Sequence, residues 1–175
     1  MHTNLRLRPA VRVVLLDPSD RALLVRWRFS DRDVWGTPGG GIDTGETHED
    51  AVRRELHEET GLRLEPDTCG TCVAHRTHVV PMENRYGEDW DGQEEWFYLI
   101  RVAAFEPRGA LSDEELRAEL LHELAWLHAD EVDRLTDAGA ARPVLIAPRA
   151  LASLLRCLAL GGQPNQPNQP IELDV

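Results

Sequence analysis

Aliphatic and β-branched residues fill two segments near the start of the chain, residues 11–17 and residues 21–28. The tripeptide between them, Pro-Ser-Asp at 18–20, has the composition of a turn, so the pattern predicts a β-hairpin. Residues 35–45, with the sequence WGTPGGGIDTG, follow neither the two-residue period of a strand nor the 3.6-residue period of a helix. This segment is therefore predicted to be a glycine-rich loop.

A helix is predicted directly after this loop. Thr47 is a good N-cap residue, and Asp50 follows it three positions later. Val52 and Leu56 form an apolar pair at i and i+4, which is typical of the buried side of a helix. Gly61 stands where a residue in the left-handed conformation ends a helix, so the helix is expected to stop there.

The rest of the chain is predicted to continue with strands and helices. The expected elements, in chain order, are a strand at 72–80, a strand at 94–102, a helix from 112 to about 121 that opens with the capping-box pair Ser112 and Glu115, a strand at 124–128, a helix at 129–135 and a long helix at 143–160. Gly161 and Gly162 would end the last helix. Residues 82–93 have the composition of an exposed, acidic and aromatic loop, a kind of loop that often carries specificity.

Length and composition indicate one domain. A chain of 175 residues is long enough to bury a sizeable core and short for two domains. We expect a single domain over residues 1–162. The tail at 163–175 contains the low-complexity segment QPNQPNQP, which cannot bury apolar area and is expected to be disordered. No apolar run approaches the roughly 20 residues of a membrane span, so no membrane partner is expected.

Charge and cysteine content narrow the partners and the compartment. The first residues lack a cleavage site behind their apolar stretch, and the three cysteines form no even-numbered set of the secreted kind. A reducing, cytoplasmic compartment is therefore expected. The net charge of −12 argues against a protein whose main partner is a nucleic-acid backbone, because such binding relies on an excess of Lys and Arg. An enzyme that handles phosphate would need metal cations to offset this charge.

Three glutamates in the predicted helix carry the strongest chemical signal. Glu55, Glu58 and Glu59 are spaced i, i+3 and i+4, which places their carboxylates on one face within about one turn. Like charges at this spacing repel one another by roughly 0.2–0.5 kcal/mol per pair, so a cation is expected among them. Hard oxygen ligands on a rigid face suit Mg²⁺, and Mn²⁺ as well. A solvated surface face is the alternative explanation for such a run.

The surroundings of these glutamates favour the metal site. The helix is entered through Pro38 and three glycines, which lack Cβ atoms and let the backbone approach a ligand closely. Residues 40–62, GGIDTGETHEDAVRRELHEETGL, match the Nudix box, G-x5-E-x7-R-E-U-x-E-E-x-G-U with U aliphatic, at every fixed position. The matching residues are Gly40, Glu46, Arg54, Glu55, Leu56, Glu58, Glu59, Gly61 and Leu62. The chain therefore resembles the Nudix hydrolase family over a motif that spans about an eighth of the sequence.

The resemblance implies an α/β fold, specifically an α/β/α sandwich around a mixed β-sheet. It implies that Glu58 and Glu59 are the principal metal ligands, with Glu55 as a further ligand or as the residue that activates water. Gly40 would supply a backbone ligand and close approach. Family members often recruit another acidic residue from a later loop, and the candidates in this chain are Glu115, Glu119 and Glu123.

Two more box residues are expected to organise the catalytic set. Arg54 would orient a box carboxylate through charge-assisted hydrogen bonds, and Glu46 would support the loop. The implied activity is metal-dependent hydrolysis of the pyrophosphate bond in a nucleoside diphosphate linked to another group, or in a nucleoside triphosphate. The substrate would be a nucleotide-derived small molecule, and family resemblance points to a homodimer. A non-catalytic sensor of nucleotide metabolites is the alternative, and the intact box carboxylates argue against it.

Several aromatic and basic residues are candidates for substrate contacts. Tyr86 and Trp90 lie in the acidic loop and could stack on a nucleobase, a contact worth roughly 1–3 kcal/mol. Incidental exposed aromatics are the alternative. Arg26, Arg28 and Arg76 either contact phosphate or solvate their strands, and the sequence does not distinguish these two roles.

A pattern of two cysteines and two histidines, Cys69-x-x-Cys72-x-x-His75-x-x-His78, resembles a metal-ligand series. Familiar zinc modules separate their two ligand pairs by a dozen or more residues. In a strand, a spacing of three residues alternates between the two faces, so these four side chains would not converge. Ordinary strand and turn residues are the preferred interpretation.

Overall fold

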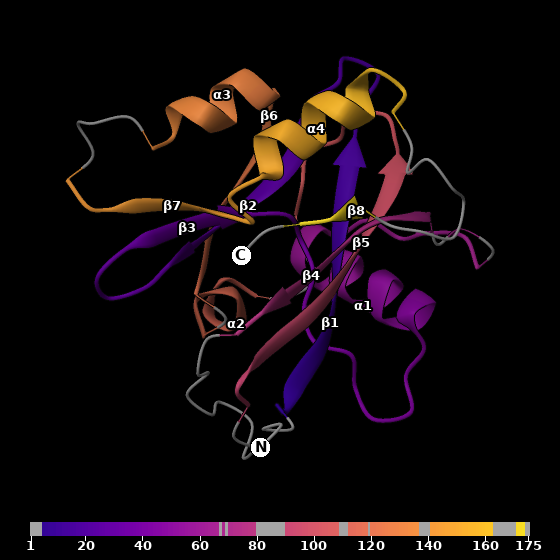
Figure 1. The fold of residues 1–175 in the computed structure, drawn as a ribbon. Helices are drawn as coiled ribbons and strands as arrows, with labels where there is room; N and C mark the ends of the chain where they lie inside the picture. The colour runs from indigo at the N-terminus through magenta and orange to yellow at the C-terminus, as the bar shows by residue number, and fades with distance from the viewer. Residues whose placement is uncertain are drawn as a thin grey trace.

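The computed structural model describes residues 5–66, 68, 70–79, 90–108, 112–118, 120–136, 141–162 and 171–173. The elements within these residues are β1 (Leu7–Leu16), β2 (Ala22–Arg28), β3 (Asp33–Gly36), α1 (His48–Thr60), β4 (Thr71–His78), β5 (Gly92–Arg101), α2 (Asp113–Ala118), β6 (Leu121–Leu127), α3 (Ala129–Arg134), β7 (Val144–Ala147), α4 (Leu151–Ala159) and β8 (Ile171–Glu172). Strands and helices are interspersed along the chain, with three strands before the first helix (Figure 1). The fold is therefore of the α/β class.

The strands form a mixed sheet in the order β7-β3-β2-β1-β5-β4-β8, and β6 also pairs with β2, antiparallel to it. β1 runs parallel to β5 along its whole length, but it meets β2 only at the hairpin, where Leu16 pairs with Ala22. The other edge of β1 carries the glycine-rich loop: Val13 N donates to Pro38 O at 2.8 Å, and Val11 N donates to Gly40 O at 2.9 Å. The loop is thereby fixed to a central strand of the sheet.

Helices cover both faces of this sheet because the side chains of β1 alternate between them. Val11, Val13 and Leu15 pack in one apolar cluster with Val52 and Leu56 of α1. Val14 and Leu16 point to the opposite face and belong to a second cluster, which contains Val132 of α3 and Leu151, Leu154, Leu155 and Leu158 of α4. Figure 1 shows α3 and α4 together on one side of the sheet and α1 on the other. The predicted α/β/α sandwich is confirmed.

The helix α1 begins and ends as its sequence predicts. The Thr47 side chain accepts a hydrogen bond from Asp50 N at the N-terminus. At the C-terminus, Gly61 adopts the left-handed conformation with φ of 76° and donates to His57 O. Local capping therefore fixes the register of the box glutamates along this helix.

Several predicted boundaries differ from the structure, and two of the differences change the type of an element. Residues 143–160 form a strand, β7, and a helix, α4, in place of one long helix, because Pro148 lies between them and cannot donate a helical hydrogen bond. β7 gains its hydrogen bonds from β3, to which it runs parallel. The predicted loop at 35–45 also starts too early, since Trp35 and Gly36 are the last residues of β3.

The end of the tail is part of the sheet. β8 runs parallel to β4, with Ile171 opposite Ala74 and Glu172 opposite His75. Leu173 N donates to His75 O at 2.8 Å, and the Leu173 side chain is 9% exposed within the α4 cluster. The expectation of disorder is wrong for residues 171–173, because their alternating apolar side chains bury against the core. Residues 163–170 lie outside the described residues, and the domain boundary at 162 stays a prediction.

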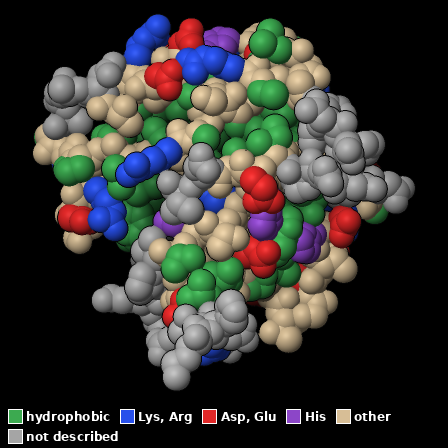
Figure 2. All heavy atoms as spheres, in the orientation of Figure 1, with side chains coloured by type: hydrophobic (Ala, Val, Ile, Leu, Met, Phe, Trp, Pro, Cys, Tyr) green, Lys and Arg blue, Asp and Glu red, His purple; other side chains and the backbone are tan. Residues whose placement is uncertain are grey.

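No helix in the described part of the chain is long and apolar enough to cross a membrane. On the face in Figure 2, acidic and histidine side chains gather where Figure 1 draws β4, β5 and β8. The ion pairs of His75 with Glu94 and with Glu172 belong to these strands. On this face (Figure 2), acidic and histidine side chains are therefore concentrated on β4, β5 and β8.

Candidate active site

The glycine loop and α1 meet through two buried glutamates. Gly39 N donates to Glu59 Oε2 at 2.8 Å, across 20 residues of sequence. A Cβ atom on Gly40 would lie 2.8 Å from the Glu55 carboxylate carbon, so only glycine leaves room for that carboxylate. Glu55 and Glu59 are 9% and 8% exposed. Both carboxylates therefore point back from the helix to the loop.

The backbone of Gly39 itself requires glycine. Its φ is +134°, and a Cβ atom there would lie 2.9 Å from Arg12 Cα in the neighbouring strand. Residues with a side chain rarely adopt this conformation. The sequence WGTPGGG thus permits a close packing of the loop against β1.

Arg54 gathers the remaining acidic groups of the box. Its Nε and Nη2 atoms each donate to the Glu46 carboxylate at 2.9 Å. Its Nη1 donates to Glu55 Oε1 at 2.7 Å and to Glu58 Oε2 at 3.3 Å, while Nη2 also reaches Gly41 O at 2.8 Å. The predicted contact between Arg54 and a box carboxylate is present, and so is the link from Glu46 to the loop.

The environment changes the proton affinity of two of these carboxyl groups in opposite directions. Burial raises the pKa of the Glu55 carboxyl above its ordinary value, although the charge and hydrogen bond of Arg54 oppose this shift. The hydrogen bond from Arg54 lowers the pKa of Glu46, which is less buried. The Glu46 carboxyl group therefore stays ionised as the partner of Arg54, whereas the Glu55 carboxyl group is protonated more readily.

The donor set fits a hard divalent cation. Carboxylate and carbonyl oxygens are the ligands that Mg²⁺ prefers, and Mg²⁺ needs only one or two carboxylates besides water and substrate phosphate. Within the described residues, no group of three or more His, Cys, Asp or Glu side chains is arranged as a preformed metal site. In the box, Arg54 bonds Glu55 and Glu58, so these two carboxylates are engaged by a guanidinium group.

A cluster of ionised side chains outside the box, with Glu95 and Arg76 buried and Arg12 partly buried, touches the same loop. Arg12 Nη1 donates to Gly39 O at 2.8 Å, and Arg12 Nε donates to Glu95 Oε1 at 2.8 Å. Arg76 Nε donates to the second oxygen of Glu95 at 2.7 Å. Our sequence interpretation did not include Arg12 or Glu95. The available signal was a charged residue inside each of two predicted strands, where apolar neighbours predict burial.

Two of the three candidates for an extra acidic ligand, Glu115 and Glu123, have other partners. Glu115 accepts hydrogen bonds from Ser112 N and Oγ at 2.8 and 2.7 Å, which confirms the predicted capping box. Glu123 pairs with Arg26 at 2.6 Å. Its strand neighbours Leu124 and Trp126 pack in the α1 cluster, so Glu123 lies on the other face of β6. Glu119 lies outside the described residues.

The two aromatic candidates for stacking on a base are Trp90 and Tyr86. Trp90 is half-buried, and the guanidinium carbon of Arg6 lies 5.2 Å from its ring centroid. A cation over its ring is compatible with either a structural or a binding role for Trp90. Tyr86 lies outside the described residues. The stacking role of both residues stays a prediction.

The Cys and His series does not form a metal site in the described part of the chain. Cys72 Sγ lies 3.8 Å from Ala74 O, within its own strand. His75 bonds Glu94 on β5 and Glu172 on β8, at 3.1 and 3.0 Å. These contacts agree with ordinary strand residues, and Cys69 lies outside the described residues.

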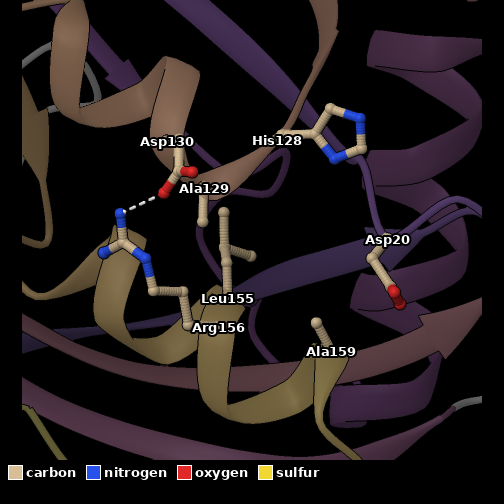
Figure 3. Close-up of a pocket in the computed structure, with 7 residues that line it drawn as sticks. All are labelled: Asp20, His128, Ala129, Asp130, Leu155, Arg156 and Ala159. Atoms are coloured by element: carbon tan, nitrogen blue, oxygen red, sulfur yellow. Dashed lines mark hydrogen bonds and ion pairs between the residues drawn. The ribbon is translucent and has the colours of Figure 1, made fainter.

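A pocket of about 220 Å³ lies elsewhere, between α3, α4 and the turn after β1. Figure 3 shows Arg156 of α4 reaching Asp130 of α3 beside this pocket, at 2.6 Å, with His128 and Asp20 at its rim. The turn that contains Asp20 follows the end of β1. The glycine loop pairs with residues 9–13 near the start of β1, so this pocket is separate from the box.

The sequence model of the NUDIX domain family matches residues 6–147. The chain belongs to the Nudix family. It is 31% identical over 133 residues to Nudix hydrolase 25 of Arabidopsis thaliana, which covers 71% of this chain and 74% of that relative. It is 34% identical over 134 residues to an RNA pyrophosphohydrolase of Caulobacter vibrioides, covering 73% and 76% of the two chains.

Comparison with solved structures supports the same family. A MutT NUDIX hydrolase from Burkholderia pseudomallei superimposes with a TM-score of 0.54 and 26% identity, over 86% of this chain and 97% of that chain. Together, these relatives show that this Nudix protein is an enzyme that hydrolyses a pyrophosphate bond. Nudix hydrolases generally need divalent metal ions.

Proposed function

We propose that this Nudix hydrolase cleaves the pyrophosphate bond of a nucleoside diphosphate linked to another group, or of a nucleoside triphosphate, with the box of α1 as its metal-dependent active site. The observation that carries the proposal is the meeting of Glu55 and Glu59 with the glycine loop. Both carboxylates are buried, and one accepts the Gly39 amide hydrogen. A merely solvated helix face would leave these groups in water.

Each box residue then has a distinct role. Glu58 and Glu59 would hold the metal, together with the Gly40 carbonyl, and Glu55 would be a further ligand or the base. A bound Mg²⁺ or Mn²⁺ supplies charge neutralisation for the diphosphate and lowers the pKa of a coordinated water. Arg54 orients Glu55 and Glu58 through its Nη1 atom, while its other two nitrogens hold Glu46.

The chemistry on the protein side is the transfer of one proton. In the base role, Glu55 takes a proton from the water that attacks a phosphorus atom of the bridge, and the bond from phosphorus to the bridging oxygen breaks. The departing oxygen keeps the electron pair. The products are a nucleoside monophosphate and a phosphorylated remainder, or pyrophosphate when the substrate is a nucleoside triphosphate.

A second substrate class is favoured by several relatives that are named RNA pyrophosphohydrolases. The 34% identical protein of Caulobacter vibrioides is named an RNA pyrophosphohydrolase, so the triphosphate at the 5′ end of an RNA is also a candidate. The net charge of −12 argues for the small-molecule class, since a nucleic-acid backbone would be repelled over much of the surface. A cytoplasmic location and a homodimer stay predictions.

A substrate panel tests the proposal. Nucleotide sugars, ADP-ribose, dinucleoside polyphosphates, oxidised nucleoside triphosphates and a 5′-triphosphorylated RNA are incubated with Mg²⁺ or Mn²⁺, and the products are separated by chromatography. In ¹⁸O water, we expect label on phosphorus in the products of the preferred substrate. Label on carbon, or equal turnover in the presence of chelator, would contradict the proposed reaction.

A further inference from the structure

We propose that Glu95 is a positioning residue for the active site: through Arg12 it fixes the glycine loop against which the box carboxylates stand. The inference rests on the proposed function of the box. It concerns residues of β1, β4 and β5 that lie outside the box motif.

The contacts form a continuous chain from the sheet to the box. Arg76 and Arg12 each donate to one oxygen of Glu95, at 2.7 and 2.8 Å. Arg12 also donates to Gly39 O at 2.8 Å, and Gly39 N donates to Glu59 Oε2 at 2.8 Å. A carboxylate in β5 is therefore joined to a box glutamate through one arginine and one glycine.

The loop is held from two sides by this arrangement. Arg12 alternates along β1 with Val11 and Val13, which pack in the α1 cluster, so its side chain leaves the opposite face of the sheet. Glu59 reaches Gly39 from α1. The N–H and the C=O of Gly39 are thus each held by a charged side chain, one from each face of the sheet.

The single charge of Glu95 stabilises two guanidinium groups, those of Arg12 and Arg76. Glu95 is 1% exposed, and burial alone would raise its pKa. The guanidinium groups of Arg12 and Arg76 outweigh that effect and hold the pKa below its ordinary value. Removing the charge of Glu95 would leave two guanidinium groups, the buried one of Arg76 and the partly buried one of Arg12, without their shared partner, and Arg12 would lose the bond that sets its orientation.

The fork of the arginine side chain matters to this role. Arg12 uses Nε for Glu95 and Nη1 for Gly39, two donors in a fixed planar geometry. A lysine at this position carries the same charge on a single nitrogen and cannot reproduce both directions at once. Arg12→Lys therefore separates the positioning role from the need for a positive charge.

The test compares Glu95→Gln and Arg12→Lys with wild type and with Asp17→Asn. Asp17 is a matched control because it is 2% exposed and also bonded by an arginine, Arg21, but it lies in the turn after β1. Binding of Mn²⁺ alone is measured from the loss of its free-ion signal in electron paramagnetic resonance. We expect the Kd for Mn²⁺ to rise by about 10- to 100-fold in both test variants, as is typical when an outer partner of a metal ligand is lost.

A second readout follows the loop without any metal. Pro38-Gly39 is the only Pro-Gly dipeptide in the sequence, so ¹³C-carbonyl proline with ¹⁵N glycine selects the Gly39 amide by NMR. We expect this signal to shift, and its hydrogen exchange to quicken, in Glu95→Gln and Arg12→Lys. Asp17→Asn should leave both the signal and the Kd unchanged even if its unfolding midpoint falls.

The outcomes separate the two proposals. A wild type that does not bind Mn²⁺ contradicts the proposed metal function, whereas the Gly39 signal still decides whether Glu95 positions the loop. Wild-type Mn²⁺ binding and an unchanged Gly39 signal in both test variants would overturn the positioning role alone. If Glu95→Gln does not fold, Arg12→Lys gives the same decision.

Discussion

Arg54 bonds both oxygens of Glu46, each at 2.9 Å, and with its remaining Nη1 atom it reaches Glu55. One guanidinium group thereby joins the loop before α1 to the carboxylates on it. The contact is fork to fork, the geometry that distinguishes arginine from lysine in recognition of carboxylates. The orientation of Glu55 should therefore depend on the shape of residue 54, and its positive charge alone should not suffice.

Arg54→Lys is expected to lower kcat by about 10- to 100-fold, because the lysine cannot hold Glu46 and Glu55 together. The rate is measured on whichever substrate of the panel is accepted. The neighbouring Arg53 provides the control, since it pairs with Asp50 and with the Pro66 carbonyl away from the box carboxylates. An equal loss in Arg53→Lys would indicate damage to the helix and not to the site.

Glu59→Gln should separate catalysis from stability. Its amide oxygen can still accept the Gly39 hydrogen bond, and the loss of one negative charge relieves repulsion within the box. In chelator, we expect the unfolding midpoint of the variant to equal that of wild type or to lie slightly above it. We expect kcat to fall by about 100-fold or more, the scale of losing one electrostatic contact to the transition state.

Wild type and Glu59→Gln are also compared with added metal. At a hundredfold excess over Kd, a single bound ion stabilises wild type by about 2.7 kcal/mol, and the variant should gain less. Differential scanning calorimetry with and without Mg²⁺ measures the gain. Glu49→Gln, in the first turn of the same helix but at an unspecified box position, is the control. Equal responses to metal in all three proteins would rule out Glu59 as a ligand.

Gly40→Ala should impair the site through space alone. The new methyl group would lie 2.8 Å from the Glu55 carboxylate carbon, so this carboxylate must move. A displacement of about 1 Å at a catalytic group can cost about 100-fold in rate. Gly45→Ala tests backbone strain without a clash, since φ there is +85° and nothing lies within 4 Å of the new atom. Only the first variant should lose turnover.

The contact of the tail with the sheet should depend on pH. Burial alone would lower the pKa of His75, but hydrogen bonds with Glu172 and Glu94 raise it above its ordinary value. A raised pKa means that the folded protein binds the proton more tightly. The stabilising contribution is complete below the ordinary pKa of histidine and is lost as the pH rises through the folded value.

The contact between His75 and Glu172 is tested by deleting residues 171–175. We expect the NMR titration of His75 to move to lower pH in the truncated chain, because Glu172 is gone while Glu94 remains. The difference in unfolding midpoint between full and truncated chains should shrink as the pH rises. A titration midpoint that does not move would show that Glu172 does not bind the imidazolium group.

The parts that the sequence predicts well are those set by local chemistry. Thr47 and Gly61 bound α1 through contacts within a few residues, and the spacing of the box glutamates then follows from the helix. β7 and β8 were not predicted, because a short strand gains its hydrogen bonds from a distant partner: β7 from β3, and β8 from β4. Such pairing leaves little trace in a four-residue or two-residue segment.

At the candidate site too, contacts between residues close in the sequence could be predicted, and contacts between distant residues could not. Arg54 and Glu46 are eight residues apart and belong to one motif, so their pairing could be predicted. Arg12 and Glu95 are 83 residues apart, and only the parallel pairing of β1 with β5 brings them together. Ser112 and Glu115 are three residues apart, so their hydrogen bond could also be predicted, while a metal role for Glu115 stays a prediction.

The pairing of β8 also bears on how the protein should be handled. A strand at the border of a sheet presents unpaired backbone N–H and C=O groups, which act as a template for strands of other molecules. Ile171 and Glu172 cover this border at Ala74 and His75. Shortening the chain before residue 171 would expose it and favour self-association, and a purification tag at the other end of the polypeptide avoids disturbing this cover.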